Sequence, residues 1–243
     1  MPLLKNTSIN ASIYFLALIG TIVAQLNGLV QLQYVCKPLL MLVLSSWFYF
    51  NSRRVGDRFT LLIQAGLFFA WVGDVILMFA DRDPFFFLVG LGAFFMTQLC
   101  YTFAFAHNIA ENHAGPGVFV SWLIAAGIVT FSFFYGWTLL PMIEETIMLP
   151  VIFYLVAITA MGVAAAFRYR RTFPLSFLLV LVGALLFITS DAILASDRFV
   201  RHLDHASWSI MLTYGIGQFM IAAGCLTHVL DPDEIRRKAV LTT

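Results

Sequence analysis

Two aspartates and one lysine stand out in this sequence, because each interrupts a long run of apolar residues. They are Lys37, Asp74 and Asp191. Charged side chains inside a bilayer are costly and commonly have a functional role. One lysine neutralises only one of two carboxyl groups, and a carboxyl group without a cation favours its protonated form when it is removed from water. The three residues therefore predict a proton donor and a carboxylate in one pocket, the pairing that acid–base catalysis needs.

The composition around these residues is that of an integral membrane protein. Of the 243 residues, 61% are hydrophobic and 11% are charged, whereas a soluble domain has about 45–50% apolar and roughly 25% charged residues. A soluble enzyme, a disordered chain and a coiled coil are therefore excluded. The chain is also too apolar for a transmembrane barrel, whose strands alternate polar and apolar residues. A net charge of +1 gives no indication of a nucleic-acid partner.

Eight apolar runs are long enough to cross a bilayer as helices, which takes about 20 residues each. Short connections join them, so we expect residues 1–243 to form a single all-α, polytopic membrane domain. The predicted spans are 11–30, 32–51, 60–80, 85–107, 117–139, 146–167, 174–196 and 207–230.

Basic residues are concentrated on one side of this predicted bundle. With eight spans, both termini share a side with the second, fourth and sixth connections. Ten of the 14 lysines and arginines fall there and three on the opposite side. Because basic loops stay in the cytoplasm, both termini are predicted to be cytoplasmic, in the inner membrane if the source is bacterial. We expect the basic clusters to contact anionic headgroups. The ten residues are Lys5, Arg53, Arg54, Arg58, Arg168, Arg170, Arg171, Arg236, Arg237 and Lys238.

The three intramembrane charges are predicted to lie at one depth. Each is five or six residues from the outer end of its apolar run. At a rise of 1.5 Å per residue, this places all three roughly 8–9 Å below the outer surface. A common depth predicts a single site that contains Lys37, Asp74 and Asp191.

An internal repeat relates the two halves of the sequence. Residues 66–77 and 183–194 share a glycine, the aspartate, an isoleucine and a leucine at an offset of 117 residues, and the same offset carries Lys37 onto Tyr154. Four spans per half predict two parallel halves, related by an axis along the membrane normal. Chance similarity between apolar segments is the alternative. The predicted halves are residues 1–110 and 111–243.

Six polar residues near or below the charged layer are candidates for contact with a substrate. The alternative is that buried amides and phenols hold the helices together, a common role in membranes. Ser190 precedes Asp191, an offset of 120 relates the two glutamines, and the tyrosines lie in the same apolar runs. The six candidates are Ser190, Tyr154, Gln98, Tyr101, Tyr214 and Gln218.

Metal and cofactor motifs are missing from the sequence. No two histidines have the i, i+4 spacing of a helical metal-binding pair. No phosphate-binding loop, dinucleotide-binding fingerprint or GxSxG nucleophile motif occurs. We therefore expect no metal and no cofactor.

Three segments together resemble the YhhN-type lysoplasmalogenase family. They are Lys37-Pro38-Leu-Leu, the stretch from Gly66 to Leu77 that includes Gly73-Asp74, and Ser190-Asp191. The length and the eight-span layout are similar as well. The resemblance implies hydrolysis of the vinyl-ether bond of a lysophospholipid, the lysoplasmalogen, to a fatty aldehyde and a glycerophospho-headgroup. The partners would be this substrate and the membrane lipids.

The predicted pocket suits that reaction. Vinyl-ether hydrolysis begins with protonation of the β-carbon and passes through an oxocarbenium ion, so it needs an acid and a nearby negative charge. Paired carboxyl groups supply both in glycoside hydrolysis. We expect Asp74 and Asp191 to be this pair, with either one as the acid. Lys37 keeps one of them ionised or meets the lipid phosphate.

Two other classes of protein remain open from the sequence. Intramembrane carboxylates in a repeated bundle are also typical of a proton-coupled transporter or lipid carrier. The third possibility is a non-enzymatic membrane-interaction protein in which Lys37 and the aspartates form only a structural ion cluster.

Overall fold

A computed structural model describes residues 5–52, 57–111 and 117–230 of the chain. Over these ranges the protein is all-helical and contains no strand, which confirms the all-α part of the predicted fold class. Each of the eight predicted spans corresponds to one α-helix. The elements are α1 (Thr7–Leu26), α2 (Val30–Ser52), α3 (Arg58–Leu77), α4 (Pro84–Glu111), α5 (Val118–Leu139), the short 3-10 helix η2 (Leu140–Met142), α6 (Glu145–Ala166), α7 (Pro174–Phe199) and α8 (Ala206–Val229).

The ends of several helices follow from local side-chain chemistry. Asn6 precedes α1, and its side chain accepts a hydrogen bond of 3.2 Å from the backbone N–H of Ile9. Asp57 precedes α3 and accepts one of 2.9 Å from the N–H of Thr60. Such caps satisfy amide groups that have no partner inside the helix. Proline is the first residue of both α4 and α7, where its missing N–H carries no penalty.

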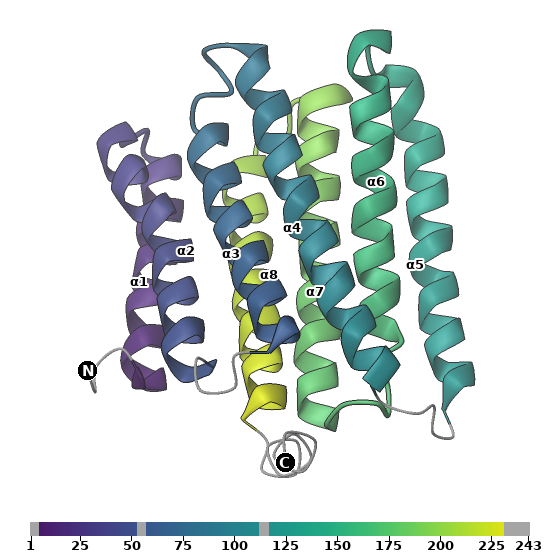
Figure 1. The fold of residues 1–243 in the computed structure, drawn as a ribbon. Coiled ribbons are helices and arrows are strands. Elements are labelled where there is room, and N and C mark those ends of the chain that lie inside the picture. The colour runs from purple at the N-terminus through teal and green to yellow at the C-terminus, as the bar shows by residue number, and fades with distance from the viewer. Residues whose placement is uncertain (1–4, 53–56, 112–116, 231–243) are drawn as a thin grey trace.

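Seven of the eight helices are long and apolar enough to cross a membrane, and α2 is the exception among the described residues. The 23 residues of α2 include Lys37 and several amides and hydroxyl groups, which lower its hydropathy. Figure 1 shows α2 beside α1 in the bundle, with the two helices antiparallel. Seven of the predicted spans are thus confirmed by length and composition, and α2 has the length but not the hydropathy.

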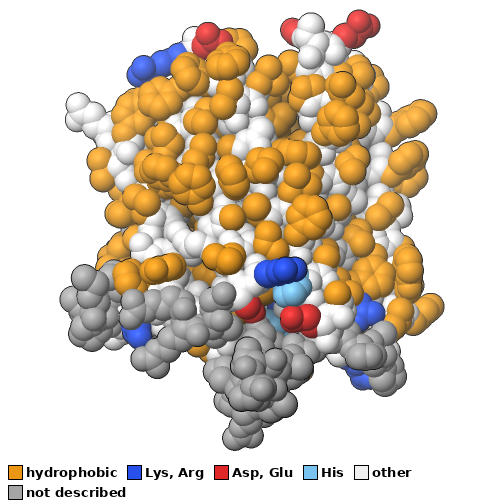
Figure 2. Space-filling view, viewed as in Figure 1, with side chains coloured by type: hydrophobic (Ala, Val, Ile, Leu, Met, Phe, Trp, Pro, Cys, Tyr) orange, Lys and Arg blue, Asp and Glu red, His pale blue; other side chains and the backbone are white. Residues whose placement is uncertain are grey.

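The helices run alternately up and down (Figure 1), so α1 begins and α8 ends at the same end of the bundle. We call this the terminal end, and the opposite one the distal end. Apolar side chains cover the middle of the visible surface, and the charged side chains gather near the two ends (Figure 2). Large apolar residues such as Phe119 and Trp137 on α5 are strongly exposed. An apolar belt between two charged ends is the surface that a bilayer requires.

One basic residue departs from the expectation that the terminal-end clusters contact headgroups. Arg168, which follows α6, is fully buried. Its guanidinium lies 5.2 Å from the centre of the Phe105 ring and donates a 3.0 Å hydrogen bond to the Ser176 hydroxyl. Burial lowers the pKa of Arg168 to about 10. For this residue the headgroup prediction is wrong, because the guanidinium packs between helices.

α7 and α8 pack closely at a pair of facing glycines. A Cβ added to Gly183 would lie 2.7 Å from the carbonyl oxygen of Gly217, and a Cβ on Gly217 would lie 2.9 Å from the carbonyl oxygen of Gly183. Both obstacles are backbone atoms, which have no rotamer by which to move aside. Small residues at such a crossing let two helix backbones approach, and this crossing fixes α8 against the helix that carries Asp191.

We therefore expect Gly183→Val to destabilise the protein. Overpacking of this kind costs about 1–3 kcal/mol, so the unfolding midpoint in mild detergent should fall clearly below that of the wild type. Gly127→Val is the matched control, because a Cβ at Gly127 meets nothing within 4 Å. Equal midpoints for the two variants would contradict the close approach of α7 and α8.

Candidate active site

Lys37 and Asp74 meet across the interface between α2 and α3. The lysine Nζ is 4.0 Å from Oδ1 of Asp74, and the side chains are 12% and 3% exposed. From α8, the hydroxyl of Tyr214 donates a 2.7 Å hydrogen bond to Oδ2 of the same carboxylate. Each oxygen of Asp74 therefore faces a cation or a donor, and both interactions favour the ionised carboxylate.

Asp191 on α7 has a different environment. Its Oδ2 accepts a short hydrogen bond from the hydroxyl of Tyr154 on α6. The ion pairs of the described residues do not include Asp191. Asp191 therefore lacks the neighbouring cation that favours the ionised form of Asp74. The two aspartates differ in the charge that their neighbours stabilise.

A polar cavity of about 350 Å³ brings the three charged residues together. Lys37, Asp74 and Asp191 all line it. We call it the polar chamber. Residues near the distal ends of α1, α3 and α7 form its rim, among them Gln25, Asp81 and Arg198. The side chain of Asp81 is fully exposed and that of Arg198 is 35% exposed, so the chamber opens at the distal end.

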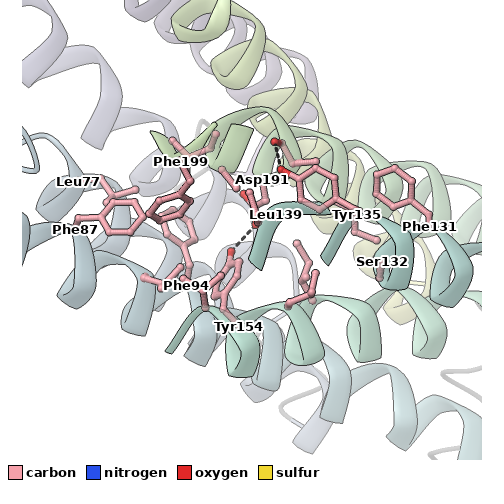
Figure 3. Close-up of a pocket in the computed structure, with 18 residues that line it drawn as sticks. Leu77, Phe87, Phe94, Phe131, Ser132, Tyr135, Leu139, Tyr154, Asp191 and Phe199 are labelled. Atoms are coloured by element: carbon pink, nitrogen blue, oxygen red, sulfur yellow. Dashed lines mark hydrogen bonds between the residues drawn. The ribbon is translucent and has the colours of Figure 1, made fainter. Parts of the chain in front are cut away.

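An apolar pocket of about 70 Å³ lies on the other side of Asp191. Figure 3 shows Tyr154 pointing at Asp191, with Phe87, Phe94 and Phe199 gathered on one side of the pocket. The pocket and the polar chamber share five lining residues, and Asp191 is the charged one. Its carboxyl group therefore stands at the boundary between a polar and an apolar cavity. The shared residues are Leu77, Phe87, Phe94, Asp191 and Leu194.

Three of the six predicted substrate contacts lie beside the carboxyl groups. Tyr214 and Ser190 line the polar chamber, and Tyr154 lines the apolar pocket. Neither Ser190 nor its neighbour Thr189 bonds to Asp191. The Ser190 hydroxyl donates to the backbone oxygen of Ile210 on α8 at 3.0 Å, and that of Thr189 to an oxygen of its own helix.

The other three predicted contacts lie outside both cavities. Gln98, Tyr101 and Gln218 are completely buried, and none of them lines the chamber or the pocket. The Tyr101 hydroxyl donates a 2.8 Å hydrogen bond to Oε1 of Gln218, which joins α4 to α8. Gln98 lies close to Tyr154. The structure thus places these three residues among the helix contacts next to the site.

Two further residues that line the cavities, Tyr135 and Phe94, were not among the residues predicted from the sequence. Tyr135 on α5 lines the apolar pocket, and its hydroxyl donates a 2.6 Å hydrogen bond to the Ala192 oxygen (Figure 3). Phe94 had one indirect signal, the glycine before Asp74. A Cβ on Gly73 would lie 2.7 Å from the Phe94 ring, so the glycine gives that ring its place at the chamber wall. Among the described residues, no group of three His, Cys, Asp or Glu side chains could hold a metal ion.

Comparisons with known proteins point to one family. The sequence model of the YhhN family matches residues 32–225. The chain is similar to lysoplasmalogenase TMEM86B of Homo sapiens, at 30% identity over 79% of this chain and 73% of the relative. It is 29% identical to TMEM86B of Rattus norvegicus, over 79% of this chain and 71% of the relative. Lysoplasmalogenase TMEM86A of Bos taurus is 28% identical over 77% of this chain and 74% of its own length. No solved structure matches the chain.

Proposed function

The chain belongs to the YhhN family, and from this premise we propose that it is a membrane-embedded hydrolase that cleaves the vinyl-ether bond of lysoplasmalogens. The products are a fatty aldehyde and a glycerophospho-headgroup. The names of the curated relatives support the activity. The observation that carries it in this structure is Asp191, which borders a polar chamber on one side and an apolar pocket on the other.

The two cavities suit the two halves of such a substrate. A lysoplasmalogen has a charged headgroup and a single hydrocarbon chain, and the vinyl-ether bond lies where they join. The chamber offers charged and polar side chains, and the pocket offers mainly apolar ones. With the headgroup in the chamber and the chain in the pocket, the reacting bond lies beside Asp191. Tyr214 and Ser190 then face the glycerol part of the lipid, and Tyr154 faces the start of the chain.

We assign the acid to Asp191 and the carboxylate to Asp74. Lys37 and Tyr214 both contact Asp74 and stabilise its negative charge. Asp191 receives a hydrogen bond from Tyr154 on one oxygen, which leaves the other oxygen to carry a proton. Proton donor and anion in one site are the arrangement that protonates an alkene and stabilises the resulting cation.

The reaction then proceeds in three steps. The proton of Asp191 moves to the β-carbon, the C=C electron pair forms the new C–H bond, and positive charge spreads over the α-carbon and the ether oxygen. A water molecule from the polar chamber attacks the α-carbon and returns a proton to the Asp191 carboxylate. The hemiacetal hydroxyl then loses its proton while its oxygen forms the C=O bond of the aldehyde, the bond to the glycerol oxygen breaks, and that oxygen takes up a proton and leaves as the alcohol. One water molecule is consumed, and Asp74 offsets the positive charge that forms in the first step.

We also propose that the two halves of the bundle form a parallel repeat and that α2 crosses the membrane with the other seven helices. The offset of 117 residues carries the Lys37–Asp74 pair onto the Tyr154–Asp191 pair, and both are direct contacts. α3 packs most extensively on α4, and α7 on α8, at matching places in the two halves. The distribution of basic residues along the sequence supports cytoplasmic termini, and with this orientation the chamber opens on the opposite side of the membrane.

The experiment that tests the proposed function measures aldehyde release. The purified protein in mild detergent is incubated with a vinyl-ether lysolipid, and in parallel with its saturated alkyl-ether twin. We expect aldehyde from the vinyl ether alone. The absence of aldehyde from folded protein in several lipid mixtures would overturn the proposal. Lipid uptake by proteoliposomes without chemical change would then establish the transporter or lipid carrier.

A further inference from the structure

A third cavity, of about 290 Å³, lies between α4 and α6. Its lining residues come from these two helices alone and are nearly all apolar, among them Leu91, Gly92 and Phe153. It shares Leu91 and Tyr154 with the apolar pocket. We call it the α4–α6 groove. The groove therefore adjoins the pocket that ends at Asp191, with Leu91 and Tyr154 between the two cavities.

The groove is open on the side of the bundle. Phe153 is 57% exposed, and Gly92 is exposed as well. Both belong to helices that are apolar enough to cross a membrane. In a bilayer this opening faces the hydrocarbon region, and the chamber mouth at the distal end faces water. A Cβ on Gly92 would meet nothing within 4 Å, so the glycine leaves open space at the groove.

We propose that the α4–α6 groove admits the hydrocarbon chain of a single-chain lipid sideways from the bilayer to Asp191. The proposal rests on the proposed function and adds the route and the binding place of the chain. The occupant follows from the apolar lining of the groove and from the wall that it shares with the apolar pocket. The polar side chain of the groove is the Tyr154 phenol, whose hydroxyl already donates to Asp191. A hydrocarbon chain matches this apolar lining, and a chain that passes from the groove into the pocket reaches the reacting carboxyl group.

A sideways route also explains how a headgroup and a chain reach opposite sides of Asp191. A lipid that moved through the chamber mouth alone would draw its chain past Lys37 and Asp74, which removes water from two charged groups. A chain that slides in between α4 and α6 stays in apolar surroundings throughout. The headgroup meanwhile stays at the level of the chamber. Tyr154 stands where groove and pocket meet and contacts the chain at the point nearest the reacting bond.

The test uses Gly92→Leu, with Gly127→Leu as its matched control. Both glycines are exposed on membrane-spanning helices, and a Cβ at either position meets nothing within 4 Å. Only Gly92 lines the groove. The probe is an alkyl-ether lysolipid with a photoreactive group near the end of its chain, which the proposed hydrolysis does not cleave. After illumination in proteoliposomes, the labelled peptides are identified by mass spectrometry.

We expect the wild type to be labelled on the α4 and α6 residues of the groove. Filling a hydrophobic site with several methylene groups costs about tenfold or more in binding, so Gly92→Leu lowers this labelling by about that factor. Gly127→Leu leaves it unchanged. Labelling of the wild type outside the groove, or equal labelling of the two variants, would overturn the proposal that the lipid chain enters through the groove. Because the probe is not cleaved, this outcome is independent of aldehyde release, and a wild type that is labelled in the groove but releases no aldehyde contradicts only the proposed function.

Discussion

Asp191→Asn is expected to lower kcat for vinyl-ether hydrolysis by about 10²–10⁴-fold, the usual contribution of a positioned acid or base. Asparagine has nearly the size of aspartate but no acidic proton to give to the β-carbon. Its amide oxygen still accepts the hydrogen bond from Tyr154, so the cavities keep their shape. We therefore expect KM to change little. The measurement is initial aldehyde release over a range of lipid concentrations, which separates kcat from KM.

Asp197→Asn is the matched control for this prediction. Asp197 lies on the same helix and also lines the polar chamber, but it is one of the residues toward the distal end. Its Oδ1 accepts a 2.8 Å hydrogen bond from the backbone N–H of Leu203, which an amide oxygen also accepts. The control variant should keep most of the wild-type kcat. A folded Asp191→Asn protein with the kcat of the control would show that Asp191 is not the acid.

The second large effect is expected at the Lys37–Asp74 pair. Asp74→Asn removes the negative charge that stabilises the oxocarbenium ion, and removing one such electrostatic contact typically costs about 10²–10³-fold in kcat. It also leaves the Lys37 ammonium without its carboxylate, which destabilises the fold. The double variant Lys37→Met/Asp74→Asn replaces both charges. We expect it to recover most of the lost stability and to remain inactive, as measured by unfolding midpoints and by aldehyde release.

This double variant distinguishes catalysis from a structural ion cluster. If the pair serves only to hold α2 against α3, the neutral pair should give a stable and active protein. If Asp74 acts in the reaction, the double variant should be stable but inactive. Lys37→Arg is the control that keeps the cation, and we expect it to retain more activity than Lys37→Met. A double variant with the wild-type kcat would contradict the role of Asp74.

The helices and the charged layer could be predicted from the sequence because both depend on distances along the chain. A run of about 20 apolar residues specifies a spanning helix by its length alone. Counting residues from the ends of such runs predicted one depth for Lys37, Asp74 and Asp191, and the three residues line one cavity. α2 shows the limit of this reasoning. Two of its polar residues, Gln33 and Lys37, line the polar chamber, and such residues lower the hydropathy on which the prediction of a span depends.

The contacts of the aspartates could not be predicted in the same way. Whether Tyr214 reaches Asp74, or Tyr154 reaches Asp191, depends on which helices are neighbours and how each is rotated. A helix that is apolar on all sides carries little signal for its rotation, so Tyr135 on α5 could not be distinguished from its lipid-facing neighbours. The same uncertainty applied to Gln98, Tyr101 and Gln218, whose depth was predictable but whose direction was not.

Asp191 borders a polar chamber and an apolar pocket, and in the proposed reaction this position determines where the two products go. The headgroup fragment would be released into the chamber and dissolve in water. The aldehyde would be released into the pocket, and the groove would return it to the bilayer. Each fragment partitions into the phase that suits it, and recombination would require both to meet again at one carboxyl group. The two products would therefore leave the site in different directions. Neither product would block the exit of the other, and the site would be free for the next substrate.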